Sequence, residues 1–142
     1  MIRILIDSSA LFSAFFSERG HSRDLIILAL KGEINLVESE YILEEVSHHL
    51  EIKAPPFLNI FQIGLENLKL DKVKPTKSQV LAAAKYVAEK DAPIIAAAKK
   101  GKVDLLVTLD KKHLLGNPKL EKFTGSAIVT PAAAVASIKA KG

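Results

Sequence analysis

The chain begins Met1-Ile2-Arg3-Ile4-Leu5-Ile6-Asp7-Ser8-Ser9, and this stretch decides the fold. The short apolar run is rich in β-branched residues and predicts a strand over about residues 2–6, buried on both faces as in a parallel sheet. Ser8 or Ser9 can then cap a helix over about residues 9–17. Ligands of open α/β sheets bind at the carboxyl ends of the strands. We therefore expect Asp7, which ends the strand, to lie at a ligand-binding edge.

The rest of the chain alternates between short apolar runs and amphipathic segments. Further strands are expected at about residues 34–37, 70–74, 103–108 and 127–130. Helices are expected at about 21–31, 40–51, 57–68, 75–89, 92–100 and 131–139, with a short helical piece ending near 115 and a turn at 116–118. This alternation predicts a doubly wound, mainly parallel sheet with right-handed crossovers. We expect a single domain over residues 1–142.

Composition limits the class of protein. Apolar residues make up 49% of the chain and the mean hydropathy is positive, which indicates a packed core. There is no cysteine, which excludes disulfides and thiolate metal sites. No apolar run approaches the roughly 20 residues that span a bilayer, and no signal peptide is recognisable. We therefore expect a soluble cytoplasmic protein with no membrane partner.

The net charge of +4 suits an anionic partner such as nucleic acid. Most of the positive charge is lysine, which contacts phosphates as a point charge and reads bases poorly. If nucleic acid is bound, we expect backbone contacts more than sequence readout.

Three aspartates are placed to converge on one edge of the sheet. Asp7 and Asp110 each follow a strong strand, and Asp91 precedes the helix that leads into the second of these strands. Each one alone is better explained as a helix N-cap. Together they predict a carboxylate cluster at the carboxyl ends of two central strands.

Two further acids come into question on other elements. On a helical wheel, Glu45 lies closer to the apolar face of the 40–51 helix than Glu44 does, so Glu45 is the better candidate to point over the sheet. Two solvated glutamates remain the alternative. Asp104 lies inside the 103–108 strand and is interpreted as a strand-edge charge in preference to a supporting carboxylate.

Carboxylates gathered in one crevice repel one another and need a cation to stay ionised. Oxygen ligands without cysteine favour Mg²⁺ or Mn²⁺. Such a site suits attack of water on a phosphodiester.

Four segments resemble the motifs of PIN domains, in the family's order and over nearly the whole chain. They are Ile6-Asp7-Ser8-Ser9-Ala10-Leu11, Ser39-Glu40-Tyr41-Ile42-Leu43-Glu44-Glu45-Val46, Asp91-Ala92-Pro93-Ile94-Ile95-Ala96-Ala97-Ala98 and Val103-Asp104-Leu105-Leu106-Val107-Thr108-Leu109-Asp110. The resemblance implies a three-layer α/β/α fold and a metal-dependent ribonuclease similar to VapC-type toxins. It implies that the acidic metal ligands and catalytic residues are Asp7, Glu45, Asp91 and Asp110. It also implies supporting roles for Ser9 and Thr108.

The chain departs from the family pattern near the last aspartate. Leu109 stands where glycine is common, which predicts a stiffer loop. Lys111 and Lys112 follow Asp110 without a further acid, so no fifth acidic ligand is expected there. These lysines are candidates for substrate-phosphate contacts, with a solvated pair as the alternative. None of the core acids is missing, and an intact site is expected.

Three histidines and one apolar stripe have simpler explanations than a role in catalysis. His48, His49 and His113 are interpreted as surface or helix-end residues, with His113 partly buried. The apolar stripe around Phe57 and Phe61 is interpreted as core, or as part of a surface for a homodimer or a cognate antitoxin.

RNA is the expected substrate. A processing or structure-specific nuclease of the same fold, or a catalytically silent RNA-binding module, remains the alternative. The first turn lacks the glycines of a nucleotide-binding loop.

Overall fold

Five parallel strands form the central sheet of the computed structural model, which describes residues 1–17 and 19–141. They are β1 (Arg3–Ile6), β2 (Asn35–Glu38), β3 (Leu70–Lys72), β4 (Leu105–Val107) and β5 (Ala127–Val129), in the order β3-β2-β1-β4-β5. The central strand β1 pairs with both neighbours, so that Leu5 lies opposite Val37 on one side and Leu106 on the other. The predicted parallel α/β sheet is confirmed.

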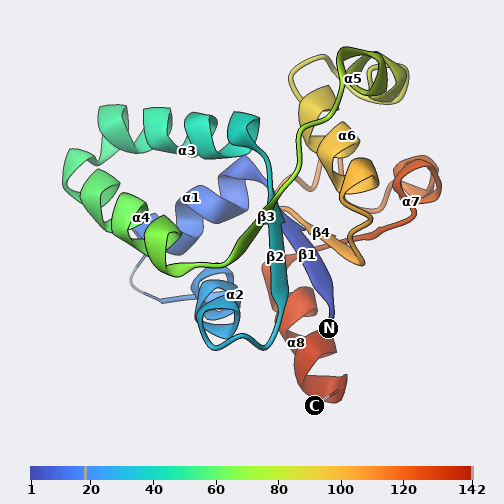
Figure 1. The fold of residues 1–142 in the computed structure, drawn as a ribbon. Coiled ribbons are helices and arrows are strands. Elements are labelled where there is room, and N and C mark those ends of the chain that lie inside the picture. The colour runs from blue at the N-terminus through green and yellow to red at the C-terminus, as the bar shows by residue number, and fades with distance from the viewer. Residues whose placement is uncertain (18, 142) are drawn as a thin grey trace.

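Helices cover both faces of this sheet (Figure 1). The helices are α1 (Ser8–Phe16), α2 (His21–Leu30), α3 (Glu40–Lys53), α4 (Pro55–Asn67), α5 (Lys77–Ala83), α6 (Ala92–Lys100), α7 (Pro118–Thr124) and α8 (Pro131–Lys141). Helices α1 to α4 lie on one side of the sheet and α5 to α7 on the other, and α8 packs against α2 and β4. The three-layer α/β/α arrangement is therefore confirmed.

Side chains at the ends of the strands start the helices that position the candidate site. The carboxylate of Asp7 caps α1 by accepting a hydrogen bond from the N–H of Ala10. The hydroxyl of Ser39 caps α3 by accepting from the N–H of Ile42. Both caps satisfy backbone donors that have no partner within the helix. As a result, α1 and α3 both begin at the carboxyl edge of the sheet.

The segment between β3 and β5 differs from the sequence prediction in three places. The helix expected over 75–89 ends at Ala83, because the N–H groups of Lys85 and Tyr86 bond to carbonyls three residues back and tighten the chain into turns. The helical piece expected before residue 115 is a series of turns. The turn expected at 116–118 instead starts α7, where Asn117 caps the helix and Pro118 takes its first position.

The apolar core holds α6 close against the sheet. The buried apolar side chains of the described residues form one cluster on both faces of the sheet. Gly101, at the end of α6, lies so near β2 that a Cβ atom there would come within 2.8 Å of Cγ1 of Val37. This close approach positions the C-terminal end of α6 against the sheet, and Asp91 lies at the other end of the helix. Within residues 1–17 and 19–141, no helix is both long and apolar enough to cross a membrane.

Candidate active site

The candidate site lies where the strand order changes direction. From β1 the chain adds β2 and β3 on one side and later β4 and β5 on the other, which leaves a crevice at the carboxyl ends of β1 and β4. The N–H of Asp7 donates to the carbonyl of Val107 at 2.9 Å, so the pairing of the two strands continues to this edge. The first strand thus delivers its terminal carboxylate to the crevice.

A cavity of about 490 Å³ occupies this crevice. All four carboxylates that the PIN resemblance implied line it, and they come from the ends of β1 and β4, from α3 and from the start of α6: Asp7, Glu45, Asp91 and Asp110. The other lining residues are Ser8, Ser9, Phe12, His49, Lys53, Lys90, Ile94, Leu109 and Leu114. The expected convergence of the acids is therefore seen in the geometry.

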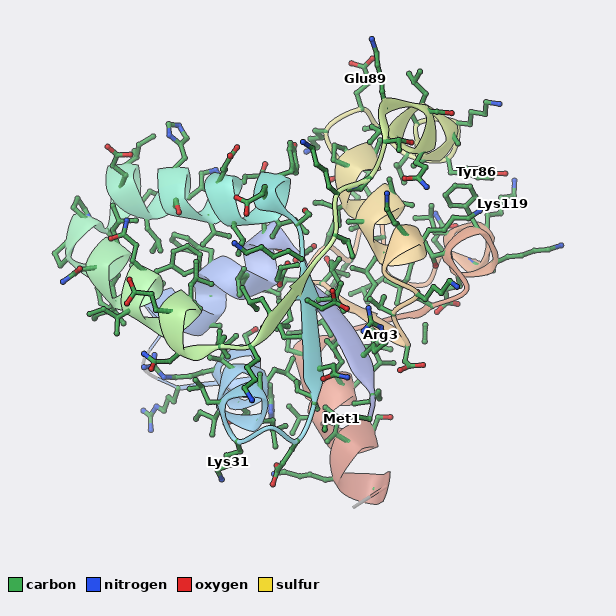
Figure 2. All side chains as sticks on the ribbon, viewed as in Figure 1. Met1, Arg3, Lys31, Tyr86, Glu89 and Lys119 are labelled. Carbon is green, nitrogen blue, oxygen red and sulfur yellow. The ribbon has the colours of Figure 1, made fainter. Side chains whose placement is uncertain are left out.

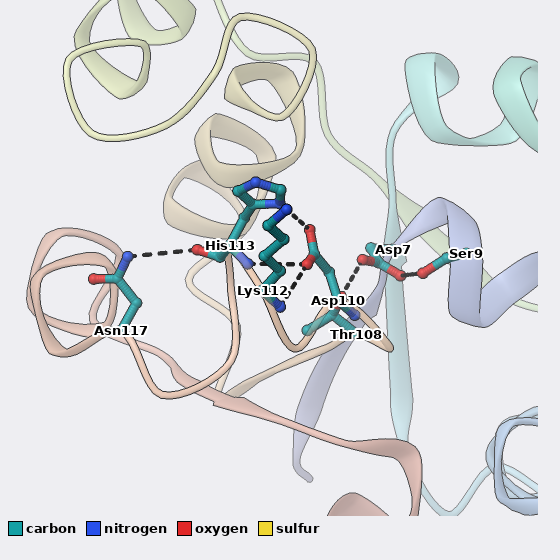
Figure 3. Close-up of polar contacts among 7 residues, drawn as sticks. All are labelled: Asp7, Ser9, Thr108, Asp110, Lys112, His113 and Asn117. Carbon is teal, nitrogen blue, oxygen red and sulfur yellow. Dashed lines mark hydrogen bonds and ion pairs between the residues drawn. The ribbon is translucent and has the colours of Figure 1, made fainter.

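Asp7 is the most enclosed of the four carboxylates. It is 3% exposed, and its Oδ1 accepts hydrogen bonds from the N–H of Ala10 at 3.1 Å and from the hydroxyl of Ser9 at 3.0 Å. Its Oδ2 accepts from the hydroxyl of Thr108 (Figure 3). Burial raises the pKa of Asp7, these hydrogen bonds oppose the rise, and the charge of Asp110 adds to it. The helix cap and the site carboxylate are the same group.

Thr108 connects Asp7 to the loop that carries Asp110. Its Oγ1 also accepts from the N–H of Asp110 at 2.9 Å. The carboxylate of Asp110 accepts at Oδ1 from the N–H groups of Lys112 and His113, both at 3.0 Å, and its Oδ2 lies 3.4 Å from Nδ1 of His113 (Figure 3). Burial acts to raise the pKa of Asp110, but the two N–H groups and the nearby imidazole outweigh it and lower the pKa.

Asp91 stands at the N-cap position of α6 without capping it. Its side chain accepts no hydrogen bond from the helix, and its Oδ2 is buried with no partner among the described residues. Burial raises the pKa of Asp91, and the charges of Asp110 and Glu45 act in the same direction against Lys90 and His113. The N-cap alternative therefore does not account for Asp91, whereas it does describe part of the role of Asp7.

Helix α3 turns Glu45 toward the cavity and Glu44 toward solvent. Glu45 is half-buried, lines the cavity and accepts a hydrogen bond from the hydroxyl of Ser8, while Glu44 is exposed. Tyr41, one turn earlier, donates its hydroxyl to the carbonyl of Lys90 at 3.1 Å and so joins α3 to the segment before α6. Burial raises the pKa of Tyr41, and the charges of Glu45 and Asp91 add to this.

The donor set suits a hard divalent cation. Four carboxylates line one cavity, the charge of Asp110 raises the pKa of both Asp7 and Asp91, and one buried oxygen of Asp91 has no partner among the described residues. A cation would relieve all three conditions, and oxygen donors favour Mg²⁺ or Mn²⁺. Within residues 1–17 and 19–141, however, no three His, Asp or Glu side chains are placed to hold one ion together.

Several charged residues take places that the sequence did not indicate. The described lysines that line the cavity are Lys53 and Lys90, whereas Lys111 and Lys112 are exposed beside Asp110. The expected partial burial of His113 is wrong, because its side chain is 53% exposed, with Nδ1 3.4 Å from the carboxylate of Asp110.

Asp104 lies at the opposite edge of the sheet. Its carboxylate accepts from the backbone N–H of Arg3 at 2.7 Å, at the start of β1 and far from the cavity. Asp104 is therefore a charge at the end of a strand, as predicted, and not a supporting carboxylate of the cavity.

Glu38 is a buried acid that sequence reasoning missed. It ends β2, is fully buried, and neither carboxyl oxygen has a hydrogen-bond partner among the described residues. Burial raises its pKa well above the ordinary value, and the nearby charge of Asp7 adds to the effect. The sequence did contain a signal for Glu38, namely an acid directly after the strand predicted at 34–37. In the structure β2 continues one residue further and ends at Glu38.

One family model matches the chain, and several solved structures share its fold. The model of the PIN domain family matches residues 3–112. PAE2754 from Pyrobaculum aerophilum is similar in structure, with a TM-score of 0.64, 19% identity and 98% of each chain covered. VapBC2 from Rickettsia felis, bound to a promoter DNA fragment, gives a TM-score of 0.64 at 12% identity over 91% of this chain and 98% of the other. DNA-bound VapBC from Salmonella typhimurium gives 0.63 at 17% identity over 92% and 99%. No curated protein matches the sequence significantly.

Proposed function

The chain belongs to the PIN domain family, and on this premise we propose that it is a metal-dependent endoribonuclease that acts as the toxin of a toxin–antitoxin pair. The proposed reaction is hydrolysis of RNA phosphodiester bonds. The similarity in fold to proteins named VapBC supports the toxin assignment, and the cavity described above supports the nuclease assignment.

One observation carries the proposal. Carboxylates from four separate segments meet around a single cavity at the carboxyl edge of the sheet, although their mutual repulsion and partial burial disfavour this arrangement in the protein alone. Groups that cost stability and still gather in one cleft are typical of a functional site. A cluster of this kind needs a positive partner, which a divalent cation would provide, and the bound cation would in turn attract the anionic phosphodiester.

The residues of the site divide into ligands and supports. Asp7, Glu45, Asp91 and Asp110 would hold Mg²⁺ or Mn²⁺, which when bound supplies the charge that draws a phosphate into the acidic cavity and polarises it. Ser9 and Thr108 hold the carboxylate of Asp7 in one orientation, and Ser8 does the same for Glu45. The unpartnered oxygen of Asp91 is available to a ligand without breaking an existing hydrogen bond.

Lysines around the cavity would neutralise the substrate. Lys53 and Lys90 line the cavity, and Lys111 and Lys112 directly follow Asp110, which also lines it. Phosphate contacts of this kind position a nucleic acid without reading its sequence. Other features of the protein would therefore select the RNA target.

Partners and location form part of the same proposal. A cognate antitoxin would inhibit the nuclease, and the protein would act in the cytoplasm as a homodimer. Helix α4 offers a surface for one of these partners, since Ile60 and Ile63 are about half exposed while Phe61 on the same helix is buried. Light scattering at several protein concentrations tests the homodimer.

Cleavage assays test the nuclease. A panel of structured and single-stranded RNAs is incubated with Mg²⁺, Mn²⁺ or EDTA, using wild type, Asp7→Asn, Asp91→Asn and the control Asp104→Asn. The proposal expects metal-dependent cleavage that both site variants lose and the control keeps. RNA binding without cleavage under every metal condition, unchanged in the site variants, would contradict it and favour a non-catalytic RNA-binding module.

A further inference from the structure

Charge is divided between the two sides of the sheet. Helices α3 and α4, residues 40–67, carry five glutamates and one lysine. Residues 74–125, which include α5, α6 and α7, carry eleven lysines and five acids. These two groups of helices lie on opposite sides of the sheet (Figure 1). A polyanion bound at the cavity is therefore attracted along the α5–α7 side and repelled from the α3–α4 side.

His113 connects the cavity to this basic side. Its imidazole lies 3.4 Å from the carboxylate of Asp110, which lines the cavity. The same residue lines a second hollow, of about 390 Å³, together with Lys85 and Tyr86. A polyanion strand that leaves the cavity past His113 therefore meets a hollow lined by the cationic Lys85 and the aromatic Tyr86.

Tyr86 and Phe123 continue the surface beyond this hollow. Their rings pack together with centroids 4.6 Å apart at an interplanar angle of 34°, and Tyr86 remains 48% exposed. Figure 2 shows Tyr86 between α5 and α7, on the outer side of the molecule. An exposed aromatic ring supported from below by a second ring is a stacking surface that accepts any unpaired base.

Lysines follow the aromatic pair. The ammonium group of Lys99 lies 4.0 Å from the centroid of the Phe123 ring. Lys99 and Phe123 line a third hollow, of about 400 Å³, together with Lys100 and Lys102. These contacts form a series that leads from the cavity past His113 to the pair of aromatic rings and then to the lysines at and after the end of α6.

We propose that this series, here called the basic track (Lys85, Tyr86, Lys99, Lys100, Lys102, His113 and Phe123), binds a single-stranded segment of RNA that extends from the cavity. The inference rests on the proposed function, because the cavity supplies the point from which the strand departs. The lysines contact phosphates, and Tyr86 stacks on a base without selecting its identity. A duplex cannot use the track in this way because its bases are already stacked on one another.

Binding without cleavage tests the basic track. Fluorescence anisotropy of a short unstructured RNA labelled with fluorescein is measured in EDTA for wild type, Tyr86→Ala and Tyr86→Phe. Loss of one stacked base should weaken binding about five-fold or more in Tyr86→Ala. Tyr86→Phe keeps the ring and should bind as wild type does. A duplex of the same sequence should bind more weakly and should not respond to Tyr86→Ala.

The lysines have their own matched control. The double variant Lys99→Gln/Lys102→Gln should bind more weakly, and the slope of log affinity against log salt should fall by about 0.7 for each lost phosphate contact. Lys31, also exposed, lies at the end of α2 on another part of the surface (Figure 2). The variant Lys31→Gln should keep the affinity and the slope of wild type. Wild-type affinity in both Tyr86→Ala and the double lysine variant, with melting temperatures unchanged, would overturn the track.

Cleavage separates this inference from the proposed function. If the chain cuts RNA, Tyr86→Ala should raise KM for a long single strand and leave kcat unchanged, and unchanged KM would overturn the track while the nuclease stands. If the chain cuts no RNA but Tyr86→Ala still weakens binding in EDTA, the track stands and the proposed function fails.

Discussion

The hydroxyl of Thr108 donates a hydrogen bond to the carboxylate of Asp7, although 101 positions separate the two residues in the chain. The same hydroxyl accepts from the N–H of Asp110, so one side chain orients two of the four proposed ligands. Neighbouring strands β1 and β4 bring the two residues together, and the hydrogen bond opposes the rise in pKa that burial imposes on Asp7.

Replacing Thr108 with valine should lower the cleavage rate about 10- to 100-fold, as loss of a group that orients a ligand does at metal sites. The variant Thr108→Ser keeps a hydroxyl and should retain most of the activity. Without the donor the pKa of Asp7 rises further, so the acid limb of the pH–rate profile should move to higher pH in Thr108→Val. A profile that coincides with wild type would show that the hydroxyl does not orient Asp7.

Glu45 and its neighbour Glu44 provide a matched pair on one helix. Glu45→Gln removes a carboxylate that lines the cavity and should reduce cleavage by about 100-fold or more, because a metal contributes several kcal/mol to such reactions. Glu44→Gln changes an exposed residue and should cut RNA at the wild-type rate. Equal rates in the two variants, measured as kcat/KM on one RNA, would remove Glu45 from the site.

Glu38 should give stability a characteristic pH dependence. The folded chain holds the Glu38 proton at pH values where the unfolded chain, with a pKa near 4.5, has lost it, so the free energy of unfolding falls as pH rises above that value. Glu38→Gln cannot ionise and should be more stable than wild type at pH 7, with the difference shrinking toward pH 4.5. Urea unfolding at a series of pH values measures this. The control Glu66→Gln, at an exposed position, should follow wild type, and parallel curves for Glu38→Gln and wild type would exclude the effect.

Divalent metal should stabilise the folded chain. Mg²⁺ at about 100 times its dissociation constant adds about 2.7 kcal/mol to the free energy of unfolding, and EDTA should reverse the rise in melting temperature. Asp91→Asn should reduce this rise, whereas Asp104→Asn, at the opposite edge of the sheet, should keep it. Thermal unfolding by circular dichroism provides the measurement. A rise of equal size in both variants would place the metal elsewhere.

Helix α4 should contribute to stability through one face only. Phe61 is fully buried and meets Phe15 edge to face with ring centroids 4.9 Å apart, so Phe61→Ala should cost about 3–5 kcal/mol. Ile63 is 51% exposed, and Ile63→Ala should change the free energy of unfolding by less than about 0.5 kcal/mol. Urea unfolding of both variants checks the burial of this helix. A similar cost for the two would show that α4 packs differently.

The sequence by itself predicted the parallel α/β fold and pointed to four acids that the structure brings to one cavity. A short run rich in β-branched residues, such as Ile2–Ile6, favours a buried strand, and acids that follow parallel strands reach one edge of the sheet. Helical periodicity also separated Glu45 from Glu44, because a side chain's direction on a helix depends on its position in the chain.

Tertiary structure alone decided what surrounds those acids. The contact of Thr108 with Asp7 and the stacking of Tyr86 on Phe123 each join segments distant in sequence, so no local pattern encodes them. The unpartnered oxygen of Asp91 likewise depends on which groups the fold places around it. The burial of Glu38 is also a result of packing between elements, which overrides the usual preference of an acid for solvent. Periodicity assigns elements and faces, whereas only packing determines which polar groups find partners.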